Sequence, residues 1–398
     1  MKLLLIVDDY LPHSKKVAAK MMHELAVQFY KNGHSVFVLT PTHNIIKRLK
    51  FEVIDGVTVI YFRSGELKNT PKVKRAINET LLSYNAWKNV NKYFKSNSFD
   101  SVIYFSPSIF FGSLVLKLKK IWKCNSYLIL RDVFPQWAVD NGLIRNRSLI
   151  HIYFSFFERL NYQSADRIGV MSNSNLQYFR KRFKSINKFE VLFNWSSISK
   201  VPKLEIKYRE ILSLNEKVVF FYGGNIGYAQ QMINLIDLAK KLNYRDDTHF
   251  VFVGEGDEVN LIMDEIQINK LSNITYHPPV SQLEYMKMLN EFDIGLFSLH
   301  PDHVTHNFPG KLLGYMDYEK PILGCVNEGN DLMDIINKNK AGFVLKTGDT
   351  EGMLSYALNL INDKELRDKM GINGKKLLEK KFSVLSASKQ IENFLKKK

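Results

Sequence analysis

The feature that most constrains the fold is a regular alternation of short apolar runs with longer helical patterns along almost the whole chain. In the first half, helical patterns such as residues 17–31 and 73–94 separate most of the apolar runs. These runs cover residues 2–8, 35–40, 57–62, 101–105, 126–131, 167–171 and 190–193. Continuous apolar runs that alternate with helices predict a parallel sheet covered on both faces.

The second half repeats this pattern. Its expected strands cover residues 218–222, 249–253, 273–277, 293–297, 322–325 and 342–345, and its expected helices cover residues 232–242, 257–268, 282–290 and 311–318. A chain of 398 residues is also too long for one ordinary core. We therefore expect an α/β protein with two doubly wound domains, residues 1–195 and 196–375, and a final helical segment, residues 376–398, that packs back toward the first domain.

The charge balance indicates anionic partners. A formal charge of +16 favours nucleic acid, an anionic membrane surface or phosphate-bearing substrates. Neither a zinc-finger spacing nor an RNP-like aromatic motif is found, which disfavours nucleic acid. No apolar run approaches the ~18 residues of a membrane span. The first strand follows Met1 without a cleavage site, and Cys124 and Cys325 lie far apart, so we expect a cytoplasmic protein with two ordinary thiols.

Ligands of doubly wound sheets bind at the carboxyl ends of the strands, so we expect the site residues there. The polar and glycine-rich stretches at these positions are residues 8–10, 106–108, 131–132, 223–225, 254–256 and 306–316.

The last of these stretches, residues 306–316, combines Pro309, Gly310 and Lys311 with the start of an amphipathic helix. Backbone amides and the helix dipole both favour an anion at such a place. A lysine in the first helical turn opposes the dipole unless an anion lies between them, so Lys311 is either a solvated lysine or a phosphate ligand.

Two glycine turns follow neighbouring strands. Residues 223–227 follow an apolar strand, where Gly223 and Gly224 would let the backbone approach a diphosphate, although plain turn chemistry would look similar. They do not fit the GxGxxG pattern of nicotinamide-binding proteins. In residues 254–257, Glu255 could contact a nucleotide, or Asp257 could simply cap a helix.

Arg131 and Asp132 end an apolar strand. A charged pair at this position is costly unless it is paired or used. Asp132 is therefore either a base or a ligand of substrate hydroxyls, or one half of a structural salt bridge. His306 is either an ordinary loop histidine or a polar group beside a donor sugar. Neither a DxD motif nor a cluster of metal-ligating side chains stands out, so we expect no metal site and no cofactor.

Residues 149–160 form an aromatic-rich helical pattern with Arg145, Arg147 and Arg159 in or beside it. The pattern fits a buried core helix. It also fits an interfacial helix on an anionic membrane leaflet, to which the basic run at residues 180–184 would add.

With these residues in place, the chain resembles the retaining glycosyltransferases of family 4 over nearly its whole length. The motifs that carry the resemblance are DDYLP at 8–12, NGHSV at 32–36, LRDVFP at 130–135, GNIG at 224–227, FPGK at 308–311 and KPIL at 320–323. Together they resemble the O-antigen and capsule branch, including the WbuB-like N-acetyl-L-fucosamine transferases. The resemblance implies the GT-B fold, in which two Rossmann-like domains face a central cleft.

It also implies transfer of a sugar, which we expect to be N-acetyl-L-fucosamine, from a UDP-sugar to a lipid-diphosphate-linked acceptor, with retention and without a metal. The protein would then be peripheral on the inner face of the cytoplasmic membrane. We expect Asp132, Arg131 and His306 near the reacting centre, and Asp9 and Ser106 on the acceptor side. The expected donor-binding residues are Gly223, Gly224, Asn225, Glu255, Phe308, Pro309, Gly310 and Lys311.

The chain departs from the family pattern at the Glu-x7-Glu element, whose positions hold His306 and Gly314. The usual diphosphate-binding Arg and Lys are also missing, with Asn225 and Gln230 or Gln231 in their region. Lys311 and loop amides are then the expected diphosphate ligands, and Glu319 or Glu328 could replace the ribose contact. Two alternatives share the fold: a UDP-sugar epimerase, and a catalytically silent nucleotide-sugar-binding partner of an assembly complex.

Overall fold

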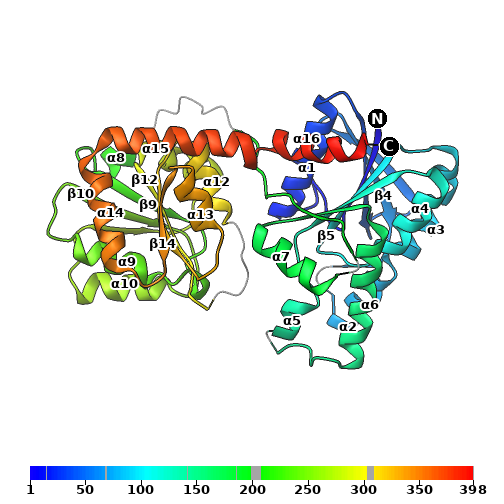
Figure 1. Cartoon of the computed structure of the whole chain (residues 1–398), viewed down its shortest axis with the longest axis horizontal. Helices are drawn as coiled ribbons and strands as arrows, with labels where there is room; N and C mark the ends of the chain where they lie inside the picture. Colours follow the sequence, from blue (N-terminus) through cyan, green and yellow to red (C-terminus); the bar gives the residue numbers. More distant parts are fainter. Residues whose placement is uncertain are drawn as a thin grey trace. The chain divides into compact units, whose positions relative to one another are not determined.

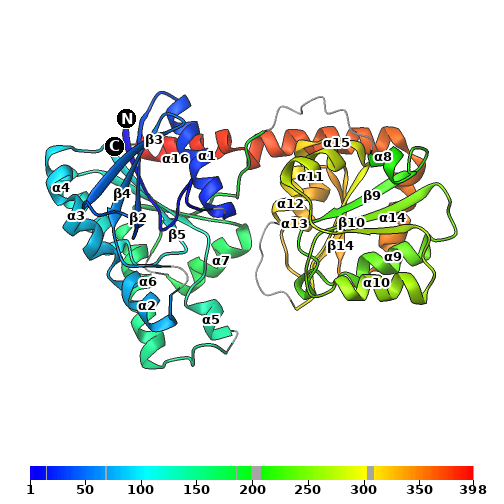
Figure 2. The same ribbon diagram turned by 180° about the vertical axis from the view of Figure 1, so that it is seen from behind.

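The computed structural model describes residues 1–14, 16–67, 70–140, 142–184, 186–198, 208–302 and 309–397. The chain forms two compact units (Figures 1 and 2). Unit 1 comprises Met1–Ser197 and Val384–Lys398, and unit 2 comprises Ile198–Ser383. Each unit is a layered α/β structure around a predominantly parallel sheet, as the alternation of apolar runs and helices predicts.

In unit 1 the described residues form an eight-stranded sheet in the order β3-β4-β2-β1-β5-β6-β7-β8. Its strands are β1 (Lys2–Ile6), β2 (Ser35–Thr42), β3 (Leu49–Ile54), β4 (Val57–Arg63), β5 (Ser101–Ser106), β6 (Asn125–Leu130), β7 (Arg167–Val170) and β8 (Phe189–Val191). Its helices are α1 (Val17–Lys31), α2 (Lys72–Thr80), α3 (Leu82–Ser96), α4 (Gly112–Trp122), α5 (Gln136–Asp140), α6 (Leu149–Ser164), α7 (Asn173–Arg182) and α16 (Val384–Leu395).

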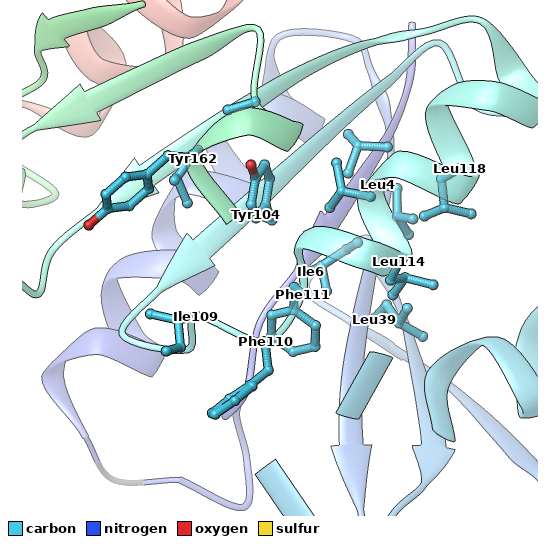
Figure 3. Packing of buried hydrophobic residues seen from close by; sticks show 14 of the residues in the cluster. Leu4, Ile6, Leu39, Tyr104, Ile109, Phe110, Phe111, Leu114, Leu118 and Tyr162 are labelled. Carbon is cyan, nitrogen blue, oxygen red and sulfur yellow. The ribbon is translucent and has the colours of Figure 1, made fainter. Parts of the chain in front are cut away.

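Strand β1 shows why this sheet is buried on both faces. Its successive side chains point to opposite sides, so Leu4 and Ile6 join one apolar cluster while Leu3 and Leu5 join the other. Helices α3 and α4 cover the first cluster, part of which Figure 3 shows, and helices α1 and α16 cover the second.

The last helix of the chain belongs to unit 1. Helix α16 packs against α1, and the side-chain amide of Asn32 donates to Glu392 at 2.6 Å. The amide of Val384, where the helix begins, donates to the carbonyl of Ser196 at 3.1 Å.

In unit 2 the described residues form a six-stranded parallel sheet in the order β11-β10-β9-β12-β13-β14. Its strands are β9 (Val218–Gly223), β10 (Thr248–Val253), β11 (Ile274–His277), β12 (Ile294–Ser298), β13 (Ile322–Val326) and β14 (Gly342–Lys346). Its helices are α8 (Tyr208–Ile211), the 3-10 turn η1 (Tyr228–Gln230), α9 (Ile233–Lys241), α10 (Val259–Ile268), α11 (Gln282–Glu291), α12 (Gly310–Asp317), α13 (Leu332–Lys338), α14 (Thr350–Asn362), α15 (Lys364–Leu377) and the π-helix η2 (Leu378–Phe382).

Two elements differ from the sequence prediction. Strand β3 pairs antiparallel with β4 at the edge of the sheet, and the prediction missed it because Lys50 and Glu52 alternate with apolar residues. The single helix expected at residues 73–94 is two helices, which meet at Leu81.

The strand order identifies where ligands bind in each sheet. In unit 1 the order reverses between β1 and β5, and in unit 2 it reverses between β9 and β12. Loops diverge at the carboxyl ends of such strand pairs and leave a crevice there.

Candidate functional site

In unit 2 the two glycine turns are joined by backbone hydrogen bonds. The amide of Gly224 donates to Val253 at 2.9 Å, and the amide of Ile226 donates to Glu255 at 2.8 Å. A Cβ on Gly254 would lie 1.8 Å from the carbonyl oxygen of Gly224, so no larger residue fits there. The glycines therefore allow the two turns to form one compact wall.

Lys311, in the first turn of α12, lies against this wall. Its Nζ is 3.4 Å from the centroid of the Tyr222 ring, and a Cβ on Gly224 would lie 3.6 Å from that Nζ. Within the described residues the ammonium has no hydrogen-bond or salt-bridge partner. Burial lowers the pKa of Lys311 well below its ordinary value. An anion placed beside it would favour the charged form of the lysine.

These features border a pocket of about 580 Å³ in unit 2. Its lining includes Gly223, Gly224, Gly310 and Lys311. The pocket is also lined by Asn225, Glu255, Pro279, Val280, Gln282 and Tyr285. The structure thus brings Gly223, Gly224, Asn225, Glu255, Gly310 and Lys311 of the predicted donor residues together around one pocket.

The remaining predicted donor residues lie just before α12. Pro309 is the N-cap residue of this helix. His306 and Phe308 lie outside the described residues. The amides of Gly310 and Lys311 have no hydrogen-bond partner in the part of the chain that the structure describes, so they can donate to an anion.

In unit 1, Arg131 contacts the protein backbone. Its guanidinium donates to the carbonyls of Leu130, Gly169, Leu192 and Phe193 at 2.8–3.2 Å. These carbonyls lie at or near the carboxyl ends of β6, β7 and β8. The arrangement supports a role for Arg131 in holding the strand ends together.

Asp132 instead lines a pocket of about 580 Å³ in unit 1. The backbone of Val133 and the side chain of Trp137 donate to its carboxylate, but burial dominates and raises its pKa. Asp8, from the end of β1, lines the same pocket, and burial raises its pKa to about 6. The pocket therefore holds two carboxylates that the surroundings drive toward protonation.

The predicted acceptor-side residues differ in their positions. Asp9 lines the pocket and accepts a hydrogen bond from Ser14 at 2.6 Å. Ser106 is fully buried, so Ser108, which lines the pocket, is the better candidate for an acceptor contact. A neighbouring pocket of about 280 Å³ shares Asp8 and Asp9.

Several pocket residues were missing from the predicted site. Asp8 was noted only as part of a strand end, although its position beside Asp9 could have indicated it. Glu79 and Trp137 reach the unit 1 pocket from helices, and Tyr285 reaches the unit 2 pocket from α11. The sequence around these three helical positions carries no local signal that marks a pocket.

Two further findings concern the described residues only. No group of three or more His, Cys, Asp or Glu side chains is placed to hold a metal ion. None of the described helices combines the length and apolar character needed to cross a bilayer.

Comparison of the fold with solved structures gives matches over nearly the whole chain. WaaG, a glycosyltransferase involved in lipopolysaccharide biosynthesis, superposes with a TM-score of 0.63 at 14% identity over 100% of both chains. HepE of Anabaena, solved with UDP and glucose, superposes with a TM-score of 0.66 at 13% identity over 99% of both chains. The fold is that of the GT-B glycosyltransferases.

Sequence comparisons agree with this fold. Residues 205–377 match the family described as glycosyl transferases group 1. The probable glycosyltransferase WbjE of Pseudomonas aeruginosa is 25% identical over 223 residues, 54% of each protein. The capsular polysaccharide biosynthesis glycosyltransferase CapM of Staphylococcus aureus is 25% identical over 192 residues, 46% of each. The chain spans about half the length of these curated relatives in the matched regions.

Proposed function

We propose that the protein is a glycosyltransferase that moves a sugar from a UDP-sugar to a lipid-diphosphate-linked acceptor during O-antigen or capsule synthesis. The observation that carries the proposal is Lys311, which has no hydrogen-bond or salt-bridge partner among the described residues and lies beside the two glycine turns in the unit 2 pocket. HepE, which shares the fold, was solved with UDP and glucose, and CapM is named for capsule biosynthesis. N-acetyl-L-fucosamine is the transferred sugar that we propose.

The unit 2 pocket would hold the departing diphosphate. In the reaction the acceptor hydroxyl oxygen bonds to the anomeric carbon, the bond to the diphosphate breaks with retention, and the hydroxyl proton leaves with the diphosphate. Lys311 and the amides of Gly310 and Asn225 would stabilise the negative charge that develops on the UDP. Because Lys311 would supply the positive charge that balances the departing UDP, we expect turnover to need no added metal.

The unit 1 pocket would hold the acceptor. Asp8 and Asp132 provide carboxylates for its hydroxyl groups, while Phe110, Phe134 and Trp137 provide apolar and aromatic surface of the kind that packs on sugar rings. Arg131 would act indirectly by fixing the backbone from which Asp132 projects.

An exposed apolar surface borders this acceptor pocket. In α6, Leu149, Ile150 and Phe156 are 85%, 59% and 61% exposed. In α2, Val73 and Ile77 are 73% and 55% exposed. The two helices are linked by a 2.6 Å hydrogen bond between the hydroxyls of Thr80 and Tyr153. Figures 1 and 2 show α2, α5 and α6 at one end of unit 1.

Basic residues accompany this surface. Arg145 and Arg147 precede α6, Arg159 lies within it, and Arg75 lies in α2. Apolar side chains with nearby arginines suit the interface of an anionic bilayer. A protein docked there would meet an acceptor that is itself anchored by a lipid. We therefore propose a peripheral location on the inner face of the cytoplasmic membrane.

The proposal can be tested by substituting the lysine. Lys311→Met keeps the length of the side chain and removes its charge, so UDP should bind at least tenfold more weakly by calorimetry, roughly 1.4 kcal/mol or more. Lys338→Met, which alters an exposed lysine of α13 in the same unit, is the control and should bind UDP like the wild type. UDP affinity that is unchanged in Lys311→Met would refute the role of Lys311.

A further inference from the structure

The unit 2 pocket contains a tyrosine that no sequence motif indicated. Tyr285 reaches the pocket from the first half of α11. A Cβ on Gly223 would lie 2.3 Å from Cε2 of its ring, and the ring centroid lies 5.5 Å from that of Phe221. These close contacts with Gly223 and Phe221 restrict the position of the ring.

The hydroxyl of Tyr285 faces Gly314 of helix α12. A Cβ on Gly314 would lie 4.0 Å from this oxygen and 3.4 Å from Cδ2 of Leu289. Since Gly314 has no side chain, the space in front of the hydroxyl stays open. The hydroxyl has no hydrogen-bond partner among the described residues, and burial raises the pKa of Tyr285, which keeps it a donor.

Helix α12 fixes the distance between Lys311 and the space in front of the Tyr285 hydroxyl. Gly310 and Lys311 line the pocket, and Gly314 follows three or four residues later, on the same face of the helix. The open space at Gly314 is therefore about one helical turn from Lys311, about 5 Å along the axis. A diphosphate at Lys311 would place its attached nucleoside at this distance, and Pro279 and Val280 offer apolar wall for the base.

We propose that the Tyr285 hydroxyl hydrogen-bonds a ribose hydroxyl of the donor nucleotide, in the space that Gly314 leaves open. This inference rests on the proposed function, because it assumes that the unit 2 pocket binds a uridine diphosphate. Tyr285 is then a substrate-binding residue that fixes the nucleoside while Lys311 fixes the diphosphate. It also makes the site selective for ribonucleotides over deoxyribonucleotides.

This contact is tested by comparing the affinities of the wild type and one variant for three ligands. Dissociation constants of UDP, 2′-deoxy-UDP and 3′-deoxy-UDP would be measured by calorimetry for the wild type and for Tyr285→Phe. The wild type should bind one deoxy ligand about 3- to 10-fold more weakly than UDP, the range expected for one hydrogen bond. Tyr285→Phe should bind UDP more weakly than the wild type by a similar factor. The variant should then bind UDP and that same deoxy ligand with equal affinity.

The control is Tyr244→Phe, which alters an exposed tyrosine. Tyr244 precedes β10, so it lies near the amino-terminal ends of the strands, whereas the pocket lies at their carboxyl ends. This control should reproduce all three wild-type affinities. If Tyr285→Phe discriminates between UDP and both deoxy ligands as the wild type does, Tyr285 does not contact the ribose, although the UDP site stands. If the wild type binds none of the three ligands, the proposed function itself fails.

Discussion

Lys311 and Asp8 are among the ionisable side chains whose surroundings oppose their charge. Lys311 lacks a partner among the described residues and packs on the Tyr222 ring, and Asp8 lies in the unit 1 pocket with a raised pKa. Each arrangement costs folding free energy, because a buried charge loses its hydration. We attribute the presence of such destabilising groups in the pockets to a role in ligand binding.

Asp8 gives a prediction about stability and pH. Its pKa of about 6 in the folded protein exceeds the ordinary value of 3.8, so the folded state binds the proton more tightly than the unfolded state. The destabilisation is absent below pH 4 and complete above pH 6. Asp8→Asn should therefore raise the free energy of unfolding at pH 7.5 by about 1 to 3 kcal/mol, and less at pH 4.

Urea denaturation at a series of pH values measures this effect. The quantity to follow is the difference between variant and wild type, which isolates Asp8 from other titrating groups. Asp9→Asn, one residue along the chain, is the matched control, since its carboxylate already accepts from Ser14. A difference for Asp8→Asn that does not grow between pH 4 and pH 6 would contradict the assignment.

At the scale of elements, helix α6 has two different halves. Its second half is fixed in unit 1, where the buried carboxylate of Glu158 accepts from Arg182 of α7 at 3.0 Å. Its first half exposes Leu149, Ile150 and Phe156. The second half is therefore held in unit 1 as expected for a core helix, while the first half exposes apolar side chains of the kind that an interfacial helix needs.

The exposed half gives a prediction about membranes. Ile150→Asn combined with Phe156→Ser should reduce cosedimentation with vesicles of phosphatidylcholine and phosphatidylglycerol at low salt, since it removes apolar side chains that would enter the interface. Ile268→Asn, which alters an exposed isoleucine of α10 in unit 2, is the control and should sediment like the wild type. A wild type that stays in the supernatant under these conditions would disprove membrane docking.

Sequence patterns predicted the elements well where one physical rule dominates. Continuous apolar runs located the buried parallel strands, because such strands need apolar side chains on both faces. The rule failed for β3, an edge strand with alternating polarity, and for the break at Leu81, where no Gly or Pro interrupts the helical pattern. Arg131 was correctly placed at the end of a strand, but its backbone partners come from β6, from β7 and from the segment after β8, and cannot be inferred locally.

At the scale of the whole molecule, the fold was more predictable than the sites. The rule that ligands bind at strand ends led to Lys311 and the glycine turns, which the structure places around one pocket, because loop and strand positions follow from the sheet order. Tyr285 was missed because its position depends on space left by Gly223 and Gly314, which come from two other elements. Such side-chain packing is a property of tertiary structure and leaves no pattern in the sequence.

The central claim, sugar transfer, is tested most directly by incubating the protein with a labelled UDP-sugar and a synthetic lipid-diphosphate-linked saccharide. The account predicts that the label moves to the lipid only when the acceptor is present, and that Lys311→Met slows this transfer at least tenfold, roughly 1.4 kcal/mol of barrier. Conversion of the UDP-sugar without acceptor would indicate an epimerase. Binding of UDP-sugars without transfer to any acceptor tested would contradict the account and indicate a silent binding partner.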